Sequence, residues 1–307
     1  MADDMGKFRI LAATDGSPSA QAAMAVALAF PWPEPSTARG VVALSSASRR
    51  AGRLLRAAEM RALSTVADPA RRMLAQRWSD AEVVAFDQPP AEAILNEAQR
   101  FGADAIVVGW RGHGTFQRLL AGSVSREIVA RAACSVLVAR TAPRAVRRLV
   151  VGFDESPGGR QTVRFLSGLA CPRGGVVVLV NVIEPVRMPP AARRLPASIR
   201  APLRGEAAKA NQERAAKAQQ KAEAAAALLQ RAGWRTKVVI RFGPSLETLL
   251  KAAAERKGDV LVVGARSTGG LERVLLGSVS GGALNHSHIP VLVVRKSLVQ
   301  PHHATRA

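Results

Sequence analysis

The sequence predicts an α/β protein built from two doubly wound domains, and three observations support this fold class. Apolar segments such as VVVLV at 176–180 lack the alternation of a half-exposed strand, which is typical of parallel strands covered by helices on both faces. These segments alternate with helical patterns, and βαβ units with right-handed crossovers give a doubly wound sheet. The whole order of elements also occurs twice. We therefore expect two parallel sheets, each flanked by helices.

The repeat is visible without any structural assumption. The segment from AIVVGWRGHG to SVLVAR, residues 105–140, aligns without a gap with VLVVGARSTG to PVLVVR, residues 260–295. Nearer the starts of the halves, AATDGSPSA at 12–20 matches VGFDESPGG at 151–159 with a smaller offset. A repeat this long indicates duplication of a whole domain rather than a solenoid. We place the boundary in TAPRAV, which gives domains 1–143 and 144–307.

The expected elements follow the same order in both halves. In the first half we expect strands at 8–14, 41–44, 82–86, 105–109 and 135–139, and helices at 17–30, 51–78, 90–100 and 122–132. Ser17 and Pro18 suit the N-cap and first position of a helix. In the second half we expect strands at 148–153, 176–182, 236–241, 260–264 and 290–294, and helices at 160–170, 206–232, 244–256 and 277–285.

The change in offset means that the second half carries about 16 extra residues, which we place in the Pro- and Arg-rich stretch 184–205. We expect a mobile, solvated loop there, with a basic lid over the second crevice as the alternative.

Charge is distributed unevenly along the chain. The net charge is +21, and residues 144–307 carry +17 of it. A basic surface attracts nucleic acid, anionic lipid or acidic proteins, but no nucleic-acid motif accompanies the charge. The sequence has no apolar run long enough for a membrane span, no signal-peptide pattern and two cysteines, so a cytoplasmic chain with reduced thiols is expected.

A glycine-rich segment after the fourth strand suggests a phosphate cradle. Gly109 and Gly112 are followed by nine residues and then by Gly122 and Ser123. Glycine lets the backbone pass close to a ligand, and the free amides and dipole of a helix N-terminus favour an anion. Ser125 offers a further hydroxyl.

Two charged residues stand near this expected cradle. Asp15 ends the first strand, where it can hold ribose hydroxyls or a Mg²⁺ ion that bridges to phosphates. Arg111 lies inside the glycine-rich loop and can neutralise a phosphate, although a solvent-facing loop arginine is the alternative. Neither a GxxxxGK(S/T) loop nor a GxGxxG sequence after the first strand is present.

The G-x2-G-x9-G-(S/T) pattern, the aspartate after the first strand and the closing PVLVVR segment resemble the universal stress protein family, twice and over nearly the whole chain. The resemblance implies a five-stranded parallel sheet in the order 3-2-1-4-5 in each half. It also implies ATP binding through the residues of the pattern, here Asp15, Gly109, Gly112, Gly122 and Ser123. Alignment of the second strands places Ala47 against Val182, near the family's adenine pocket.

The second half departs from this pattern, because Ser267 replaces the second glycine. Its candidate nucleotide-binding residues are Asp154, Val182, Gly264, Ser267, Gly277, Ser278 and Ser280. Family members commonly dimerise through the fifth strand, so 135–139 and 289–294 are expected to pair within this chain as an intramolecular pseudo-dimer. A homo-oligomer is the alternative assembly.

These observations predict an ATP-binding stress-response protein that acts as a nucleotide-gated regulatory module. Only Asp15 stands near the loop as a candidate base, so we expect no catalytic residues and little or no hydrolysis. Two alternatives remain: a scaffold that binds partners but no nucleotide, and a basic protein associated with nucleic acid or an acidic partner.

Overall fold

The computed structural model of the chain describes residues 6–43, 53–112, 121–265 and 277–295. The first half contains β1 (Phe8–Thr14), α1 (Pro18–Ala29), β2 (Ser36–Ala43), α2 (Arg53–Ala75), β3 (Glu82–Phe86), α3 (Pro90–Phe101), β4 (Ala105–Gly109), α4 (Ser123–Arg131) and β5 (Ser135–Ala139). The second half contains β6 (Arg148–Gly152), α5 (Pro157–Ser167), β7 (Val176–Ile183), the 3-10 helix η1 (Pro190–Arg194), α6 (Ala197–Arg231), β8 (Arg235–Phe242), α7 (Ser245–Glu255), β9 (Val260–Gly264), α8 (Ser278–His286) and β10 (Val291–Val294).

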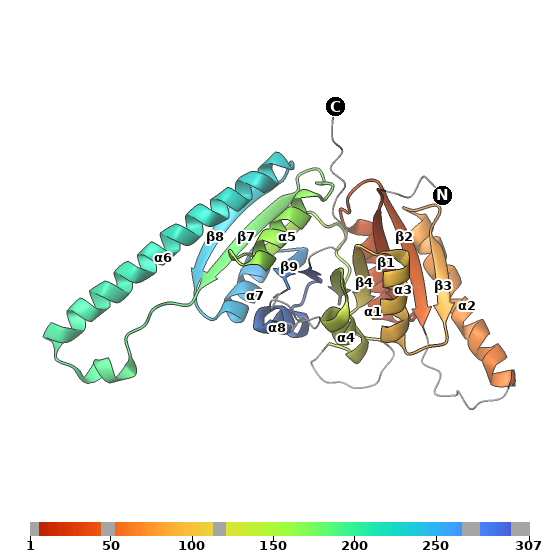
Figure 1. Cartoon of the computed structure of the whole chain (residues 1–307), viewed down its shortest axis with the longest axis horizontal. Helices are drawn as coiled ribbons and strands as arrows, with labels where there is room; N and C mark the ends of the chain where they lie inside the picture. Colours follow the sequence, from red (N-terminus) through yellow and green to blue (C-terminus); the bar gives the residue numbers. More distant parts are fainter. Residues whose placement is uncertain (1–5, 44–52, 113–120, 266–276, 296–307) are drawn as a thin grey trace.

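The strands form one ten-stranded sheet in the order β3-β2-β1-β4-β5-β10-β9-β6-β7-β8. Within each half the neighbouring strands are parallel and follow the order 3-2-1-4-5, which confirms the predicted fold of both halves. The halves meet through β5 and β10, which pair antiparallel with Val136–Val138 opposite Val291–Val293. This pairing confirms the expected intramolecular pseudo-dimer, and Figure 1 shows the two halves side by side around it.

The helices cover both faces of the sheet, and each face has a core that continues across the two halves. Helices α1, α2, α5 and α6 contribute to one buried cluster, and α3, α4, α7 and α8 to the other. On the first face, the Phe8 ring stacks on Trp32 and meets Phe165 of the second half edge-on, with centroids 6.1 Å apart. The Ala170 amide also donates to the Pro31 carbonyl across the halves at 3.1 Å. The two domains therefore share a hydrophobic core on each face of the sheet.

The predicted start of α1 is confirmed. The Ser17 hydroxyl accepts a hydrogen bond from the Ala20 amide at 3.2 Å, and Pro18 occupies the first turn. The second half uses the same device, because Ser156 accepts from the Gly159 amide at 3.1 Å ahead of α5. Helix α5 thus begins at Pro157 rather than at 160, and its first turn is set by the cap rather than by the apolar pattern.

Two equivalent arginines cross the joint between the halves. Arg295, at the end of β10, donates from Nη1 to the Ala132 carbonyl at 2.8 Å and from Nη2 to the Val129 carbonyl, at the C-terminal end of α4. Arg140, at the end of β5, donates to the Asn285 carbonyl in α8 at 3.1 Å. Each arginine therefore caps the last turn of the other half's final helix, where a positive charge is favoured.

The insertion in the second half differs from the expected loop. Residues 190–194 form η1, and α6 already begins at Ala197, so the helix includes Pro202 and runs for 35 residues. Proline is disfavoured inside a helix because it has no amide hydrogen to donate to the carbonyl four residues earlier, and Pro202 lies in the second turn of α6. Figure 1 shows α6 lying along β8 and extending well beyond the edge of the sheet. The expectation of a loop through 205 was therefore wrong, because most of the extra length is helical.

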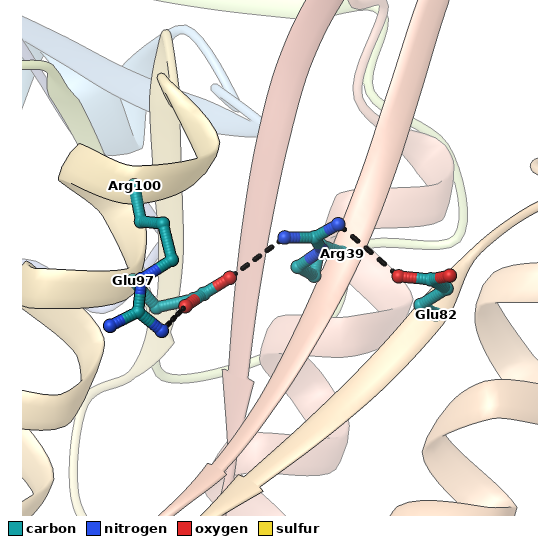
Figure 2. A network of polar contacts seen from close by, with 4 residues as sticks. All are labelled: Arg39, Glu82, Glu97 and Arg100. Carbon is teal, nitrogen blue, oxygen red and sulfur yellow. Dashed lines mark hydrogen bonds and ion pairs between the residues drawn. The ribbon is translucent and has the colours of Figure 1, made fainter. Parts of the chain in front are cut away.

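A buried carboxylate ties α3 to the outer strands of the first half. Glu97 is 2% exposed and accepts from Arg39 of β2 at 2.8 Å and from Arg100 at 3.2 Å. Arg39 also pairs with Glu82 of β3 at 3.2 Å, so its guanidinium lies between two carboxylates (Figure 2). The positions equivalent to Arg39, Glu97 and Glu82 in the second half are Val178, Ala252 and Lys237, so neither the central arginine nor its two carboxylates are repeated. The network is therefore particular to the first half and is not required by the fold.

Within the described part of the chain, no helix is long and apolar enough to cross a membrane.

Candidate functional site

A cavity of about 310 Å³ opens at the carboxyl ends of the strands in the second half. Its floor is formed by the ends of β6, β7 and β9, from Gly152 to Asp154, from Val180 to Val182 and from Val263 to Ala265. Strand β6 lies between β7 and β9. The chain therefore continues from β6 to β7 on one side and later adds β9 on the other side. Ligands of doubly wound sheets bind at such a switch point.

The lining of this cavity combines apolar side chains with the N-terminal turns of three helices. The apolar side chains are those of Val180, Val182, Leu249, Val263 and Val279. The N-terminal turns of α5, α7 and α8 line the cavity through Pro157–Gly159, Ser245, Gly277 and Ser280. The first amides of a helix lack intrahelical partners, so three helix N-termini together favour an anion in this cavity.

The predicted aspartates lie at the ends of the first strands of both halves. Asp154 is exposed in the cavity and its Oδ1 accepts from the amide and hydroxyl of Ser156. Asp15 is half-buried, and its Oδ1 accepts from the Ser17 amide at 3.0 Å. The two carboxylates therefore share one orientation, set by the turn that leads into the first helix of each half.

The structure brings Asp15 and Gly112 together although they are far apart in sequence. A Cβ atom on Gly112 would lie 2.3 Å from Asp15 Oδ2, so any other residue there would require the carboxylate to move. The corresponding position in the second half is Ser267, which lies outside the described residues.

The first glycine of the pattern has a packing role in both halves. A Cβ on Gly109 would lie 2.9 Å from the backbone of Ser19 and Ala20, and a Cβ on Gly264 would lie 2.9 Å from the backbone of Gly158. Glycine here allows the N-terminal turn of α1 or α5 to rest directly on the end of β4 or β9. The phosphate-cradle hypothesis did not consider this helix packing, which gives a second reason for glycine at the first position of the motif.

The helix-start residues of the pattern divide into engaged and exposed groups. In the first half, the Gly122 amide donates to the Trp110 carbonyl at 2.8 Å, and the buried Ser125 hydroxyl donates to the same carbonyl at 3.1 Å. In the second half, the buried Ser280 hydroxyl donates to the Gly264 carbonyl at 3.1 Å. These bonds hold the helix start against the strand end.

Three further members of the predicted set line or face the carboxyl edge. Ser123 and Ser278, the first residues of α4 and α8, are exposed and point their amides toward this edge as helix N-termini. Gly277 is the N-cap of α8 and lines the cavity.

Trp110 is a residue of this region that sequence reasoning did not single out. Its indole N–H donates to the Leu284 carbonyl of the other half at 2.9 Å. The Arg111 and Arg140 guanidinium carbons lie 4.0 and 3.4 Å from its ring centroid. Burial and the nearby charge of Arg111 lower the pKa of Arg140. In the repeat, Trp110 takes the position that Ala265 has in the second half, and this difference was the available signal in the sequence. Trp110 contacts the joint between the halves, not a ligand.

The register of the second strands corrects one predicted equivalence. Strand pairing sets Val41 against Ala13 and Val180 against Gly152, and Ala13 and Gly152 are equivalent in the repeat. The counterpart of Val182 is therefore Ala43 rather than Ala47. The sequence alignment slipped because the apolar run VVAL hides the earlier start of β2. Ala47 itself lies outside the described residues.

Metal ligands are sparse in this region. Within residues 6–43, 53–112, 121–265 and 277–295, no group of three or more histidine, cysteine, aspartate or glutamate side chains could hold an ion. One carboxylate in each half fits a Mg²⁺ ion that is held mainly by phosphates and water, but not a site made wholly of protein ligands.

The fold and the cavity define a doubly wound α/β protein with a ligand crevice at the carboxyl ends of its strands. The model of the universal stress protein family matches the chain twice, over residues 8–140 and 145–295. A universal stress protein from Mycobacterium tuberculosis is 29% identical over 226 residues, which cover 68% of this chain and 66% of that protein. The match thus spans just under two thirds of the relative's own length.

Solved structures agree on the fold. A universal stress protein from Archaeoglobus fulgidus has a TM-score of 0.63 at 16% identity and covers 94% of this chain and 96% of its own. A universal stress protein structure from Pseudomonas aeruginosa has a TM-score of 0.55 at 15% identity and covers 94% of this chain and 92% of its own. The chain belongs to the universal stress protein family.

Proposed function

We propose that this chain binds ATP or a related adenine nucleotide at the carboxyl edge of its sheet and acts as a nucleotide-gated regulatory module in the stress response. The observation that carries the proposal is the cavity of the second half, which combines apolar side chains with three helix N-termini. Its volume of about 310 Å³ lies within the usual range for small-molecule sites. Family membership adds support, because the family includes ATP-binding members.

The two kinds of lining in the cavity suit the two ends of a nucleotide. Val180, Val182 and Leu249 offer an apolar surface to a purine ring. The N-termini of α5 and α8 offer amides and a positive dipole end to the phosphates, with the exposed Ser278 hydroxyl beside them. Asp154 stands where a ribose or a phosphate-bound Mg²⁺ ion would lie, and the Mg²⁺ ion would supply charge neutralisation of the phosphates.

We extend the proposal to the first half, where Asp15 and Gly112 lie together at the equivalent edge. The first half keeps both glycines of the pattern. If both halves bind, the chain takes up two nucleotides.

The lining of the second crevice favours binding over rapid hydrolysis. Among its described lining residues, Asp154 is the only carboxylate, and its Oδ1 is engaged by Ser156. A general base must reach the attacking water with an available lone pair, and no lysine or histidine of the described lining can assist it. We therefore propose at most slow turnover of ATP.

Isothermal titration with MgATP tests the assignment with a pair of matched variants. Val182→Trp fills the second crevice, and Ala43→Trp fills the equivalent place in the first half. Each variant should remove one binding site and leave the other, so each serves as the control for the other. Circular dichroism and the melting temperature confirm that both variants fold.

Unchanged affinity and stoichiometry in both folded variants would overturn the nucleotide assignment. Absence of binding in the wild type, together with no nucleotide released at 260 nm by heating the purified protein, would instead favour a scaffold that binds partners alone.

A further inference from the structure

A second cavity, of about 520 Å³, lies at the opposite edge of the second half's sheet, where β6, β7 and β8 begin. Its charged lining consists of five arginines and one aspartate: Arg144, Arg147, Arg148, Arg173, Arg235 and Asp259. The arginines come from the link between the halves, from the start of β6, from the turn before β7 and from the start of β8. We call this feature the arginine cavity.

The single carboxylate does not neutralise the arginine side chains. Asp259 Oδ2 accepts hydrogen bonds from the backbone amides of Arg147 and Arg148, at 2.9 and 2.7 Å. Because this oxygen holds the start of β6, the carboxylate has a structural task. Within the described residues, none of the five arginine side chains forms an ion pair with a carboxylate. The cavity therefore concentrates positive charge.

Two of the guanidinium groups are held in place by carbonyl oxygens rather than by acids. Arg148 donates to the carbonyls of Arg256 and Lys257, at 3.1 and 3.4 Å. Arg235 donates to the Gly174 carbonyl at 2.9 Å. Such bonds orient an arginine without neutralising it, so its remaining donors stay available for an anion.

The duplication shows that the fold does not need two of these arginines. The positions equivalent to Arg173 and Arg235 in the first half are Glu34 and Asp80. The aspartate itself is present in both halves, because Asp104 Oδ2 accepts from the Arg9 amide at 2.9 Å as Asp259 accepts from Arg148. The structural carboxylate is thus common to both halves, whereas the charge at these two positions is reversed in the second.

The rim of the arginine cavity is rigid. The Val176 amide donates to the Arg147 carbonyl at 2.8 Å, and the Asp259 amide donates to the Arg148 carbonyl at 2.8 Å. The turn before β7 is closed by the Gly175 amide, which donates to the Pro172 carbonyl at 2.7 Å. A preorganised backbone lowers the entropy cost of ligand binding.

We propose that the arginine cavity binds a compact oligophosphate, at a site separate from the nucleotide crevice. Guanidinium forks match phosphate oxygens with paired hydrogen bonds, and several of them converging on one hollow favour several linked phosphates. The arginines surround a hollow instead of following a line, which favours a compact anion over an extended nucleic acid. Strand β6 runs from one site to the other. Its five residues make four steps of roughly 3.3 Å, so the two sites are about 13 Å apart.

Titration of the full chain with inorganic tripolyphosphate at 0.15 M salt tests the proposal. The test variant is Arg173→Glu with Arg235→Asp, which introduces acidic residues that the first half tolerates at the equivalent positions. The control variant is Arg61→Glu with Arg72→Asp on α2, where both side chains are exposed and the change in net charge is the same. We expect at least about tenfold weaker binding in the test variant and less than about twofold in the control.

Two further arms identify the ligand's source and separate this proposal from the nucleotide assignment. Tripolyphosphate should still bind the protein that carries Val182→Trp and Ala43→Trp, whether or not those changes abolish ATP binding. If ATP without Mg²⁺ also binds this crevice-blocked protein at the arginine cavity, the cavity recognises the phosphates of a nucleoside polyphosphate. If ATP does not bind, the cavity prefers a bare phosphate chain. Either result supports an oligophosphate site in the arginine cavity.

Three outcomes would overturn the proposal. The first is equal weakening in the test and control variants, which would indicate attraction by net charge alone. The second is loss of tripolyphosphate binding in the crevice-blocked protein. The third is binding of a single-stranded RNA, but not of tripolyphosphate, that depends on Arg173 and Arg235, because the arginines would then contact a nucleic acid.

Discussion

The two arginines at the joint between the halves provide a matched pair for testing how the ten-stranded sheet is held together. Arg295 is 7% exposed, and burial lowers its pKa because the charged form loses water. Its guanidinium makes close hydrogen bonds to the Ala132 and Val129 carbonyls. Arg140 makes one such bond, to Asn285 at 3.1 Å, and lies on the Trp110 ring.

Replacement of either arginine by methionine keeps much of the side-chain volume and removes the donors. A hydrogen bond from a charged group contributes about 1.5–3 kcal/mol, and a carbonyl left buried without a partner adds to the loss. Arg295→Met should therefore lower the free energy of unfolding by about 3–5 kcal/mol. Arg140→Met, with one longer bond and a cation–π contact, should lower it by about 1–2 kcal/mol.

Urea unfolding followed by circular dichroism and tryptophan fluorescence measures both values. Trp110, one of four tryptophans, lies in the joint, so its share of the fluorescence change reports separation of the halves, while circular dichroism reports loss of the helices. Because both halves share one core on each face, wild type and Arg140→Met should show coincident transitions. Equal losses in the two variants, or a loss below about 1 kcal/mol in Arg295→Met, would refute the reasoning that burial and bond number set the contribution.

Three further predictions concern thiol reactivity, a motif glycine and the buried carboxylate. Burial raises the pKa of Cys134 to about 12, so at pH 8 only about one molecule in ten thousand carries the Cys134 thiolate. An alkylating reagent should therefore modify Cys171 first and Cys134 only after unfolding. Equal alkylation rates of the two cysteines in the native protein would contradict this. Gly264→Ala forces a methyl group against backbone 2.9 Å away and should lower stability by about 1–3 kcal/mol without nucleotide present, as measured by urea unfolding; an unchanged midpoint would show that packing does not explain this glycine. Glu97→Ala should lower the free energy of unfolding by about 1–3 kcal/mol because it removes the buried partner of Arg39. Adding Arg39→Val should recover most of that loss. A double variant that is less stable than Glu97→Ala alone would disprove the coupling between the two residues.

Local sequence signals located most elements of the fold. The bounds of β1, β3, β4, β5 and β9 match the predicted ranges, because each is a short apolar run bounded by polar or glycine residues. Strand β2 begins at Ser36, five residues before the predicted start, because its polar first part is held by pairing with β1 rather than by its own apolar pattern. The slip from Ala43 to Ala47 has the same origin.

The nucleotide site stays a prediction, but part of its geometry can be compared with the sequence. Asp15 and Gly112, which follow the first and fourth strands, lie together at the carboxyl edge as their positions in the sequence indicated. The sequence did not indicate that Gly109 is needed for helix packing, or that the Ser125 hydroxyl is bonded to a carbonyl. Such roles depend on contacts between segments that are 15 to about 90 residues apart in the sequence. No local pattern encodes those contacts.

The sequence by itself determined the duplication, the parallel α/β class and the positions of most strands, because apolar runs, caps and turn residues act over a few neighbouring residues. The tertiary structure alone decided that β5 and β10 join two sheets into one, that Arg140 and Arg295 cap each other's halves, and that five arginines surround one hollow. These features arise when strand order brings distant segments to the same edge, where charge and packing act through space rather than along the chain.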